Sequence, residues 1–484
     1  MRLDELIGEG EATGEAAAAA RVTGCAIDHR KVAPGTIFGA FRGLAHNGED
    51  FIPGAVEAGA IAVVARPEAY VPAPAVHIAA AEPRRVFARL AARVFAPFPE
   101  TVIAVTGTNG KTSTVEMVRQ LWRMQGFAAA SIGTLGVTTT DGEGKASAVS
   151  TGLTTPDIVT FLANMAGLRR EGVTHAAFEA SSHGLAQFRT EGLPVKVAGF
   201  TNLSRDHLDY HGTMAAYLEA KLRLFTEVVD KDGAAVVWAD DDASSRVIEL
   251  ARERGLRLVT VGAKGETLRL VDRRPTQLGQ TLTVEIEGKA RTVNLPLIGA
   301  YQAANALVAA GFALATGSAP GDVLGGLSRL QPVRGRLERA VISASGAPVY
   351  VDYAHTPDGL RAAIEALRPH TAKRLIVVFG AGGDRDTGKR PEMGAIAAAL
   401  ADHVIVTDDN PRTEAPAAIR AAIMAATPGG REIGDRRAAI AEAIALAGEG
   451  DVVLVAGKGH ETGQIVGDRV LPFDDVQVAR ECAA

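Results

Sequence analysis

The sequence contains little cysteine, no long apolar run and no excess of positive charge. Cys25 and Cys482 are the only cysteines among 484 residues, which is too few for a disulfide framework and typical of a reducing compartment. No apolar run approaches the roughly 18 residues that span a bilayer, and the acidic segment Met1–Glu15 lacks the basic start of a secretory signal. The net charge of −5 gives no general attraction to nucleic acid or anionic lipid. We therefore expect a cytoplasmic protein that binds neither nucleic acid nor membrane.

Short apolar runs recur along the chain, and most are followed by a stretch long enough for an amphipathic helix. The runs are Ala60–Ala65, Val102–Thr106, Val197–Phe200, Ala234–Val237, Leu375–Phe379, His403–Thr407 and Val452–Ala456. Continuous apolar strands that alternate with helices predict parallel sheets covered on both faces. Ligands of such sheets bind beyond the carboxyl ends of the strands.

Length and proline-containing breaks divide the chain into three predicted α/β units. Domains of roughly 100–200 residues suggest about three for this length. The breaks at Ala96–Glu100 and Leu330–Gly335 each precede a new apolar run. We predict domains at residues 1–97, 98–330 and 331–484.

A glycine-rich segment follows the strand predicted at Val102–Val105 and precedes a helix predicted at Thr114–Gln125. It consists of Gly107, Thr108, Asn109, Gly110, Lys111, Thr112 and Ser113. Glycines let backbone N–H groups wrap an anion, and the helix start adds its dipole. Lys111 would pair with the β- and γ-phosphates of a nucleotide, and the Thr112 hydroxyl can bind Mg²⁺. Val105 replaces a glycine of the standard P-loop; a plain glycine turn is the alternative, but it leaves the Lys-Thr pair unexplained.

The shortened loop Gly107–Thr112 resembles that of the Mur ligase family, which reads Gly-Thr-Asn-Gly-Lys-Thr. The resemblance continues through further motifs over nearly the whole chain. It implies an α/β fold with a small N-terminal domain, a central P-loop-type domain with a mostly parallel sheet, and a Rossmann-like C-terminal domain. It also implies ATP and Mg²⁺ as cofactors. The residues assigned to ATP are Gly107, Thr108, Asn109, Gly110, Lys111, Thr112, Ser113, Asn305, Arg336 and Asp352.

Polar residues gather after two further apolar runs. Glu179 follows the run Ala176–Phe178, and a carboxylate at a strand end is a good ligand for a hard cation such as Mg²⁺. The segment Phe200–Gly212 contains His207 and His211. A capped helix start explains some of its polar residues, and either histidine taken alone is more often structural.

The resemblance assigns metal ligands and catalytic residues within these segments. It implies that Thr112 and Glu179 hold the Mg²⁺ that bridges the ATP phosphates, and that His207 holds a second Mg²⁺. Lys221 matches the family's carbamylated lysine, whose carbamate helps to hold the second metal; the alternative for a helical lysine is a surface charge. Lys111, Lys221 and His207 are thus the implied catalytic residues.

Three polar clusters follow strands that are predicted in the third domain. They lie at Gly380–Asp386, Asp408–Arg412 and Ala456–Glu461. Each could be a polar turn, but three at one edge of a sheet favour a binding site. The sequence Asp409, Asn410, Pro411 and Arg412 matches the motif by which family members that add meso-diaminopimelate differ from those that add L-lysine. A guanidinium can bind the extra carboxylate of meso-diaminopimelate with two hydrogen bonds.

The resemblance completes both substrate sites. It adds Arg385, Gly457 and Glu461 to the amino-acid site, where Glu461 would pair with the distal ammonium. Residues 21–97 resemble the family's uridine-nucleotide domain, although His29 replaces the serine of the usual Asp-Ser-Arg. The residues implied for UDP-MurNAc-dipeptide binding are Ile27, His29, Leu44, Ala45, His46, Thr154, Thr155, Ser181, Gln187 and Arg189.

The implied activity is an ATP-dependent ligation in peptidoglycan precursor synthesis. Meso-diaminopimelate would be joined to the D-glutamyl γ-carboxylate of UDP-MurNAc-L-Ala-D-Glu through an acyl phosphate, by a protein that we expect to be a monomer. Three alternatives are the same ligation with L-lysine, a ligase like folylpolyglutamate synthetase, and a non-enzymatic nucleotide switch.

Overall fold

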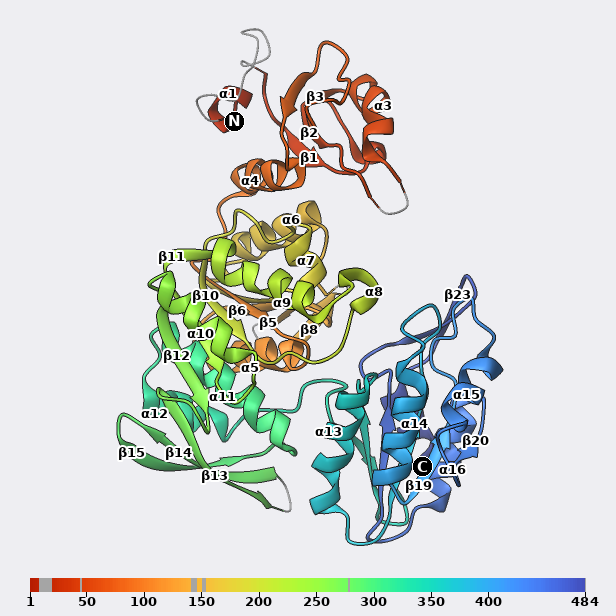
Figure 1. The fold of residues 1–484 in the computed structure, drawn as a ribbon. Helices are drawn as coiled ribbons and strands as arrows, with labels where there is room; N and C mark the ends of the chain where they lie inside the picture. The colour runs from red at the N-terminus through yellow and green to blue at the C-terminus, as the bar shows by residue number, and fades with distance from the viewer. Residues whose placement is uncertain (8–19, 44–45, 141–145, 150–153, 277–278, 484) are drawn as a thin grey trace.

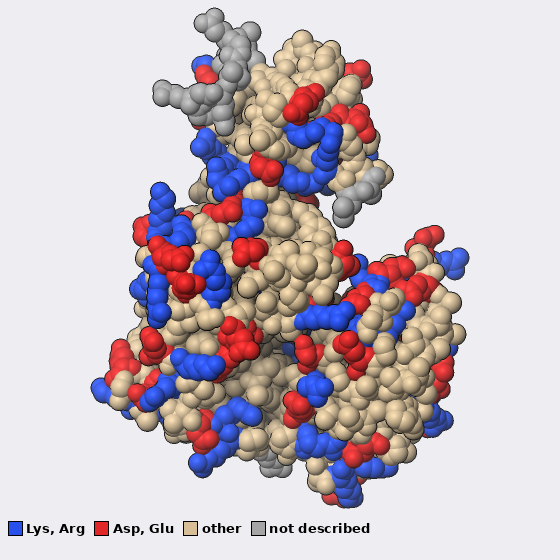
Figure 2. All heavy atoms as spheres, viewed as in Figure 1, with Lys and Arg blue, Asp and Glu red and all other residues tan. Residues whose placement is uncertain are grey.

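The computed structural model describes residues 1–7, 20–43, 46–140, 146–149, 154–276 and 279–483. Three sheets follow one another along the chain, each with its own helices. Figure 1 shows the N-terminal sheet at one end of the molecule, the large central sheet next to it, and the C-terminal sheet beside the central one. Figure 2 shows basic and acidic side chains interspersed over one face of the molecule.

The N-terminal sheet is small and entirely parallel. Its order is β1-β2-β3-β4, with strands at Gly24–Ala26, Thr36–Gly39, Ala60–Ala65 and Val76–Ala79. The helical segments of this part are α1 (Leu3–Leu6), η1 (His29–Lys31), η2 (Gly48–Phe51), α3 (Ile52–Glu57) and α4 (Pro83–Phe95). Helix α4 packs its Phe87 and Leu90 into a core shared with the central sheet.

The central sheet has eleven strands in the order β15-β14-β13-β12-β11-β10-β5-β9-β6-β7-β8. Its middle strands are parallel, and antiparallel pairs form both edges. The strands are β5 (Thr101–Thr106), β6 (Ala129–Gly133), β7 (Gly136–Thr140), β8 (Ala146–Val149), β9 (His175–Glu179), β10 (Val195–Phe200), β11 (Val229–Trp238), β12 (Arg257–Gly262), β13 (Leu268–Thr276), β14 (Gly279–Ile286) and β15 (Lys289–Leu295).

Helices cover both faces of this sheet, as the unbroken apolar strands require. Along β5, Val102 and Ala104 face one core while Ile103 and Val105 face the other. The first core contains α6 (Ile158–Arg170) and α10 (Ser244–Glu253), and the second contains α5 (Lys111–Met124), α11 (Ala300–Ala315) and α12 (Pro320–Leu327). The remaining helices are α7 (Ser182–Ala186), α8 (Leu208–His211), α9 (Met214–Arg223) and the π-helical turn η3 (Leu224–Val228).

The C-terminal sheet has the order β16-β17-β21-β18-β19-β20, in which only the β16–β17 pair is antiparallel. Its strands are β16 (Glu338–Ile342), β17 (Pro348–Asp352), β18 (Leu375–Phe379), β19 (His403–Val406), β20 (Arg431–Glu432) and β21 (Val452–Ala456), and β22 (Gly463–Val466) pairs with β23 (Arg469–Pro472) in a separate hairpin. One face is covered by α13 (Pro357–Leu367), α14 (Lys389–Leu400) and α15 (Pro416–Met424), and the other by α16 (Arg436–Leu446) and α17 (Asp475–Ala483).

The predicted α/β class with mostly parallel sheets is confirmed, and every apolar run predicted as a strand lies in one, except that β19 ends one residue before Thr407. The helix predicted at Thr114–Gln125 begins earlier, at Lys111, because Gly110 adopts a left-handed conformation that starts the helix directly after the loop. The boundaries near residues 97 and 330 stay predictions. None of the helices in the described part of the chain is long and apolar enough to cross a membrane.

The C-terminal core contains one fully buried ion pair. Arg436 of α16 donates to both oxygens of Asp475, at 2.8 and 2.7 Å, and neither side chain is exposed. Removing one charge of a buried pair leaves the other without compensation. We predict that Asp475→Leu lowers the free energy of unfolding by about 3–5 kcal/mol, measured by urea titration. Arg436→Met in the same chain should restore most of the loss; equal stabilities of the single and double variants would contradict this account.

Candidate active site

A cavity of about 1900 Å³ lies between the central and C-terminal parts. It is lined by residues that come from the carboxyl ends of strands in both sheets. Among the predicted site residues, its wall contains Thr154, Thr155, Ser181, Arg189, His207, Arg385, Asp409, Asn410, Arg412, Gly457 and Glu461. Two substrate sites predicted on separate domains therefore open into one space.

The phosphate loop joins β5 to α5 with two glycines in conformations that other residues rarely adopt. Gly107 has φ +145° and Gly110 has φ +85°. A Cβ on Gly107 would lie 1.9 Å from Thr201 Oγ1, and one on Gly110 would lie 2.2 Å from Asn305 Oδ1. The backbone thus makes a cradle that a side chain would fill, with Asn305 of α11 beside the first turn of α5.

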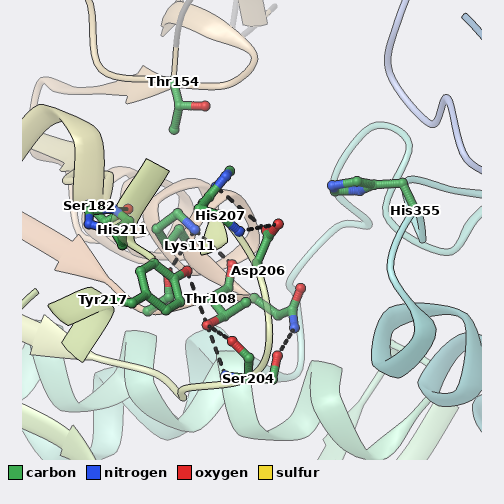
Figure 3. A network of polar contacts seen from close by, with 12 residues as sticks. Thr108, Lys111, Thr154, Ser182, Ser204, Asp206, His207, His211, Tyr217 and His355 are labelled. Atoms are coloured by element: carbon green, nitrogen blue, oxygen red, sulfur yellow. Dashed lines mark hydrogen bonds and ion pairs between the residues drawn. The ribbon is translucent and has the colours of Figure 1, made fainter. Parts of the chain in front are cut away.

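The polar segment after β10 supports this loop from behind. Asn109 N donates to Asn202 Oδ1 at 2.9 Å, and Thr201 Oγ1 donates to Asn109 O at 2.6 Å. Ser204 N donates to Thr108 Oγ1 at 2.9 Å. These bonds join residues more than ninety positions apart, and Figure 3 shows the part around Thr108 and Ser204. Thr201, Asn202 and Ser204 therefore hold the loop in place.

Two lysine ammonium groups meet at one carbonyl oxygen of the loop. Lys111 Nζ donates to Gly107 O and Thr108 O at 2.9 and 2.8 Å, and Lys221 Nζ donates to Gly107 O at 2.7 Å. Lys221 is only 1% exposed and lies over the Tyr217 ring, 4.2 Å from its centroid. Burial, and then the charge of Lys111, holds the pKa of Lys221 well below its usual value. The site therefore disfavours a second ammonium beside Lys111 and favours the neutral amine of Lys221.

Two residues with oxygen atoms that can bind Mg²⁺ lie next to the loop. Glu179 is 1% exposed and accepts hydrogen bonds from the backbone N and the Oγ1 of Thr134, at 2.7 and 3.1 Å. The Thr112 hydroxyl accepts from Arg336 at 3.0 Å. In the described part of the chain no three His, Cys, Asp or Glu side chains form a metal cluster. A hydroxyl and one carboxylate fit Mg²⁺, which completes its shell with water and phosphate oxygens.

His207 directly precedes α8 with φ +53°, and its Nε2 lies 3.5 Å from the Asp206 carboxylate. Partial burial lowers the pKa of His207 to about 4, although 43% of its side chain is exposed, and a neutral imidazole can act as a metal ligand. His183 packs against it with ring centroids 4.8 Å apart, and burial lowers the pKa of His183 to about 4 as well. No signal in the sequence indicated that His183 would contact His207.

Arg336 connects the C-terminal part to the phosphate loop through Thr112. Its guanidinium lies over the Tyr353 ring, 4.5 Å from the centroid. Nearby, Asp352 accepts from Leu337 N at 2.6 Å and from Tyr301 Oη at 3.2 Å, and burial raises the pKa of Asp352 to about 6. Polar contacts thus hold the start of the C-terminal part next to the phosphate loop. Figure 3 shows His355 of the C-terminal part on the far side of the gap from Asp206 and His207.

Residues implied for the muramoyl-peptide form one connected group on the central part. Arg189 donates to Thr155 O at 2.8 Å and to Gln187 Oε1 at 2.7 Å. Thr155 Oγ1 donates to Ser181 Oγ at 3.0 Å, and Thr154 Oγ1 lies 3.2 Å from Thr134 Oγ1. The structure therefore brings all five residues together, next to Glu179.

The residues implied for the uridine lie on the N-terminal part, away from the cavity wall. His29 stacks on Phe51 with ring centroids 4.4 Å apart and an interplanar angle of 2°. Ile27 packs against the apolar core, and His46 is exposed. Leu44 and Ala45 lie outside the described residues. The imidazole at position 29 thus presents an aromatic face where a serine would present a hydroxyl.

The implied amino-acid site occupies the carboxyl ends of β18, β19 and β21. Arg412 has φ +53° and donates to Gly383 O at 2.7 Å, and Asn410 Nδ2 donates to Glu461 Oε2 at 2.8 Å. Asp409 is 8% exposed, and its Oδ2 is a buried atom without a hydrogen-bond partner among the described residues. A Cβ on Gly457 would lie 2.6 Å from that oxygen. Pro411 and Arg385 complete the assigned set, and Arg385 lines the cavity.

Comparison with known proteins adds direct evidence of kinship. A protein of Zymomonas mobilis named UDP-N-acetylmuramoyl-L-alanyl-D-glutamate–2,6-diaminopimelate ligase is 59% identical over 464 residues, which cover 95% of this chain and 94% of that one. A protein of the same name from Bradyrhizobium diazoefficiens is 53% identical over 482 residues, covering 98% and 97%. The chain belongs to the Mur ligase family.

Family models match this Mur ligase in three places. They are described as the Mur ligase family catalytic domain (residues 21–97), the Mur ligase middle domain (105–313) and the Mur ligase glutamate ligase domain (335–459). A solved structure of a UDP-N-acetylmuramoyl-L-alanyl-D-glutamate–2,6-diaminopimelate ligase has a TM-score of 0.72 at 32% identity and covers 100% of this chain and 98% of that one. The three-part architecture is therefore that of the family.

A half-buried histidine of the C-terminal part, His460, is expected to make the stability of this Mur ligase depend on pH. Burial, and then Arg336, lowers the pKa of His460 from 6.5 to about 3. Below pH 6.5 the unfolded chain binds a proton there that the folded chain does not, so this contribution to stability is lost as pH falls toward 3. We predict that His460→Gln flattens the fall of Tm between pH 6.5 and 5. The exposed His403 is the control, and His403→Gln should leave the wild-type slope; equal slopes for all three proteins would refute the assignment.

Proposed function

We propose that this Mur ligase joins meso-diaminopimelate to the D-glutamyl γ-carboxylate of UDP-MurNAc-L-Ala-D-Glu at the expense of ATP. The observation that carries the proposal is the cavity that receives Arg412, Asn410 and Glu461 from one side and the muramoyl-peptide residues from the other. The curated relatives described above carry this activity in their names. The product would serve peptidoglycan precursor synthesis.

The amino-acid site fits a ligand whose distal carbon bears both a carboxylate and an ammonium group. Arg412 and the Asn410 amide donate hydrogen bonds, as a carboxylate requires, while Glu461 offers an acceptor for an ammonium group. Meso-diaminopimelate carries both groups at its distal carbon, whereas L-lysine lacks the carboxylate. Lysine would leave Arg412 unpaired in a closed site, at a cost of about 1–3 kcal/mol.

The ATP site would activate the D-glutamyl γ-carboxylate of the substrate. The triphosphate of ATP would lie on Gly107–Ser113, with Asn305, Arg336 and Asp352 around the nucleotide. Attack of the γ-carboxylate oxygen on the γ-phosphorus forms an acyl phosphate and releases ADP, and Lys111 neutralises charge that develops on the phosphoryl oxygens. Bound Mg²⁺, held by Thr112 and Glu179 and at a second position by His207 and a carbamylated Lys221, would neutralise further phosphate charge.

The second step forms the amide. The free amine of meso-diaminopimelate attacks the acyl carbon, its proton leaves, and the carbon–oxygen bond to phosphate breaks, so that inorganic phosphate departs. Arg189, Thr155 and Ser181 would hold the peptide so that its carboxylate faces the γ-phosphate. Approach of the C-terminal part, through contacts such as Arg336 with Thr112, excludes water that would hydrolyse the intermediate.

Ile27, His29 and His46, together with Leu44 and Ala45, belong to the proposal as the uridine site. The domains at 1–97, 98–330 and 331–484 would then carry the uridine nucleotide, ATP and the amino acid respectively. We retain the expectation that the protein is a cytoplasmic monomer. The alternatives have less support, because a folylpolyglutamate synthetase has no use for the uridine domain and a nucleotide switch has no use for the amino-acid site.

Acceptor choice tests the proposed function. With ATP, Mg²⁺ and UDP-MurNAc-L-Ala-D-Glu, we expect phosphate release that depends on meso-diaminopimelate, with kcat/KM about 5- to 150-fold above that for L-lysine. Arg412→Gln should reduce this preference by lowering the value for meso-diaminopimelate. Equal values for both acceptors, or release that needs neither acceptor nor UDP substrate, would rule the proposal out.

Carbamylation of Lys221 has its own test. The depressed pKa of the buried Lys221 keeps a fraction of the amine neutral, and a neutral amine adds CO₂ to give a carbamate and a proton. We predict that Lys221→Ala lowers kcat by about 100-fold or more, and that acetate or propionate restores part of the activity by entering the vacated space. Lys231→Ala, at an exposed lysine, is the control. Unimpaired turnover, or no response to any short carboxylate, would remove the carbamate from the mechanism.

A further inference from the structure

A buried lysine lies behind the amino-acid site, and neither the sequence motifs nor the proposed chemistry uses it. Lys458 follows β21 and is completely inaccessible to solvent. Its Nζ donates to Asn410 Oδ1 at 2.9 Å and to Glu461 Oε2 at 3.0 Å. Because a buried ammonium without such partners is costly, the lysine and its two acceptors are held in one arrangement.

The contacts of Asn410 fix which way its amide faces. Oδ1 accepts from Lys458 Nζ and from Ile465 N, the latter at 2.9 Å. Both of these groups can only donate, so the atom that faces them must be the oxygen, and Nδ2 must face Glu461. One N–H of Nδ2 goes to Glu461 Oε2 at 2.8 Å. The other N–H remains for a ligand, and Asn410 lines the cavity.

The same lysine determines which oxygen of Glu461 is available. Oε2 accepts from both Lys458 and Asn410, whereas Oε1 accepts no hydrogen bond within the described part of the chain. Glu461 also lines the cavity. The site therefore presents a donor, Asn410 Nδ2, and an acceptor, Glu461 Oε1, side by side and in a fixed order.

We propose that Lys458 is a positioning residue that sets this donor–acceptor order and thereby makes the site specific for a distal carbon bearing both a carboxylate and an ammonium. The ligand carboxylate would bind the Asn410 amide and Arg412, and the ligand ammonium would bind Glu461 Oε1. Without Lys458, the amide loses one of the two donors that orient it and Glu461 loses its buried counter-charge. The inference rests on the proposed use of a diamino acid at this site.

The test is Lys458→Met, which keeps the length of the side chain and removes its donors. We expect KM for meso-diaminopimelate to rise about tenfold or more, as for the loss of a hydrogen bond to a charged group, and the preference over L-lysine to fall. KM for ATP and for UDP-MurNAc-L-Ala-D-Glu should stay within about twofold, and kcat at saturating acceptor should change little. Lys458→Gln, which retains a donor, should recover part of the loss.

Val453→Ala provides the matched control for a purely structural role. Val453 lies in β21, five positions before Lys458, and is completely buried in the core on one face of the sheet. The substitution should lower Tm by cavity formation and leave every KM unchanged. If Lys458→Met lowers Tm but leaves KM for meso-diaminopimelate unchanged, or raises all three KM values together, the positioning role is wrong.

A double variant keeps the proposal testable if the single variant does not fold. Lys458→Met combined with Glu461→Gln leaves no unpaired buried charge. We expect its KM for meso-diaminopimelate to exceed that of Glu461→Gln alone by about fivefold or more, because the Asn410 amide is released as well. Equal KM values would refute orientation of the amide by Lys458. Wild-type activity with meso-diaminopimelate, measured alongside, tests the proposed function separately.

Discussion

The ammonium groups of Lys111 and Lys221 are bound to the same carbonyl oxygen, that of Gly107. Two positive charges brought this close in a buried place repel each other, and burial disfavours both. The proposed carbamylation of Lys221 would remove one of these charges, and Lys111 would then pair with the phosphates that the glycine conformations and the start of α5 are suited to hold. Hydrogen bonds with Thr201, Asn202 and Ser204 hold the backbone of the loop in this conformation.

The central and C-terminal sheets impose a further constraint, because the carboxyl ends of their parallel strands face one cavity. Polar residues follow the ends of β5, β9 and β10 on one side and of β17, β18, β19 and β21 on the other. A reactive acyl phosphate made on the first side can therefore meet an amine held on the second. Arg336 contributes to both sides, because it follows the connection between them and reaches Thr112 on the loop. The chemistry needs no covalent enzyme nucleophile, only placement of reacting groups and stabilisation of charge.

Much of this arrangement could be predicted from local sequence. The unbroken apolar strands gave the α/β class, and the loop and the motif at Asp409–Arg412 lie at strand ends as parallel sheets require. The family kinship inferred from those motifs is confirmed by relatives of high identity. The individual site assignments and the domain boundaries stay predictions.

The features of the site that could not be predicted from the sequence depend on contacts between segments that are far apart in the chain. Asn109 and Asn202 are 93 positions apart, and Lys458 and Asn410 are 48 apart. A lysine between two glycines looks like an exposed turn, whereas Lys458 is buried and contacts Asn410, in the segment after β19. The stacking of His29 on Phe51 is equally invisible in a motif that expects serine. Pattern reasoning locates strand ends but does not show which side chains meet there.

In the proposed mechanism, direct attack on ATP in the shared cavity activates the γ-carboxylate. The most direct test of this step uses UDP-MurNAc-L-Ala-D-Glu with ¹⁸O in the γ-carboxylate, turned over with ATP and meso-diaminopimelate, and mass analysis of the released phosphate. Because the carboxylate oxygen that attacks phosphorus leaves with it, the account predicts one ¹⁸O atom in each inorganic phosphate. Phosphate that carries no ¹⁸O while the amide forms would contradict it.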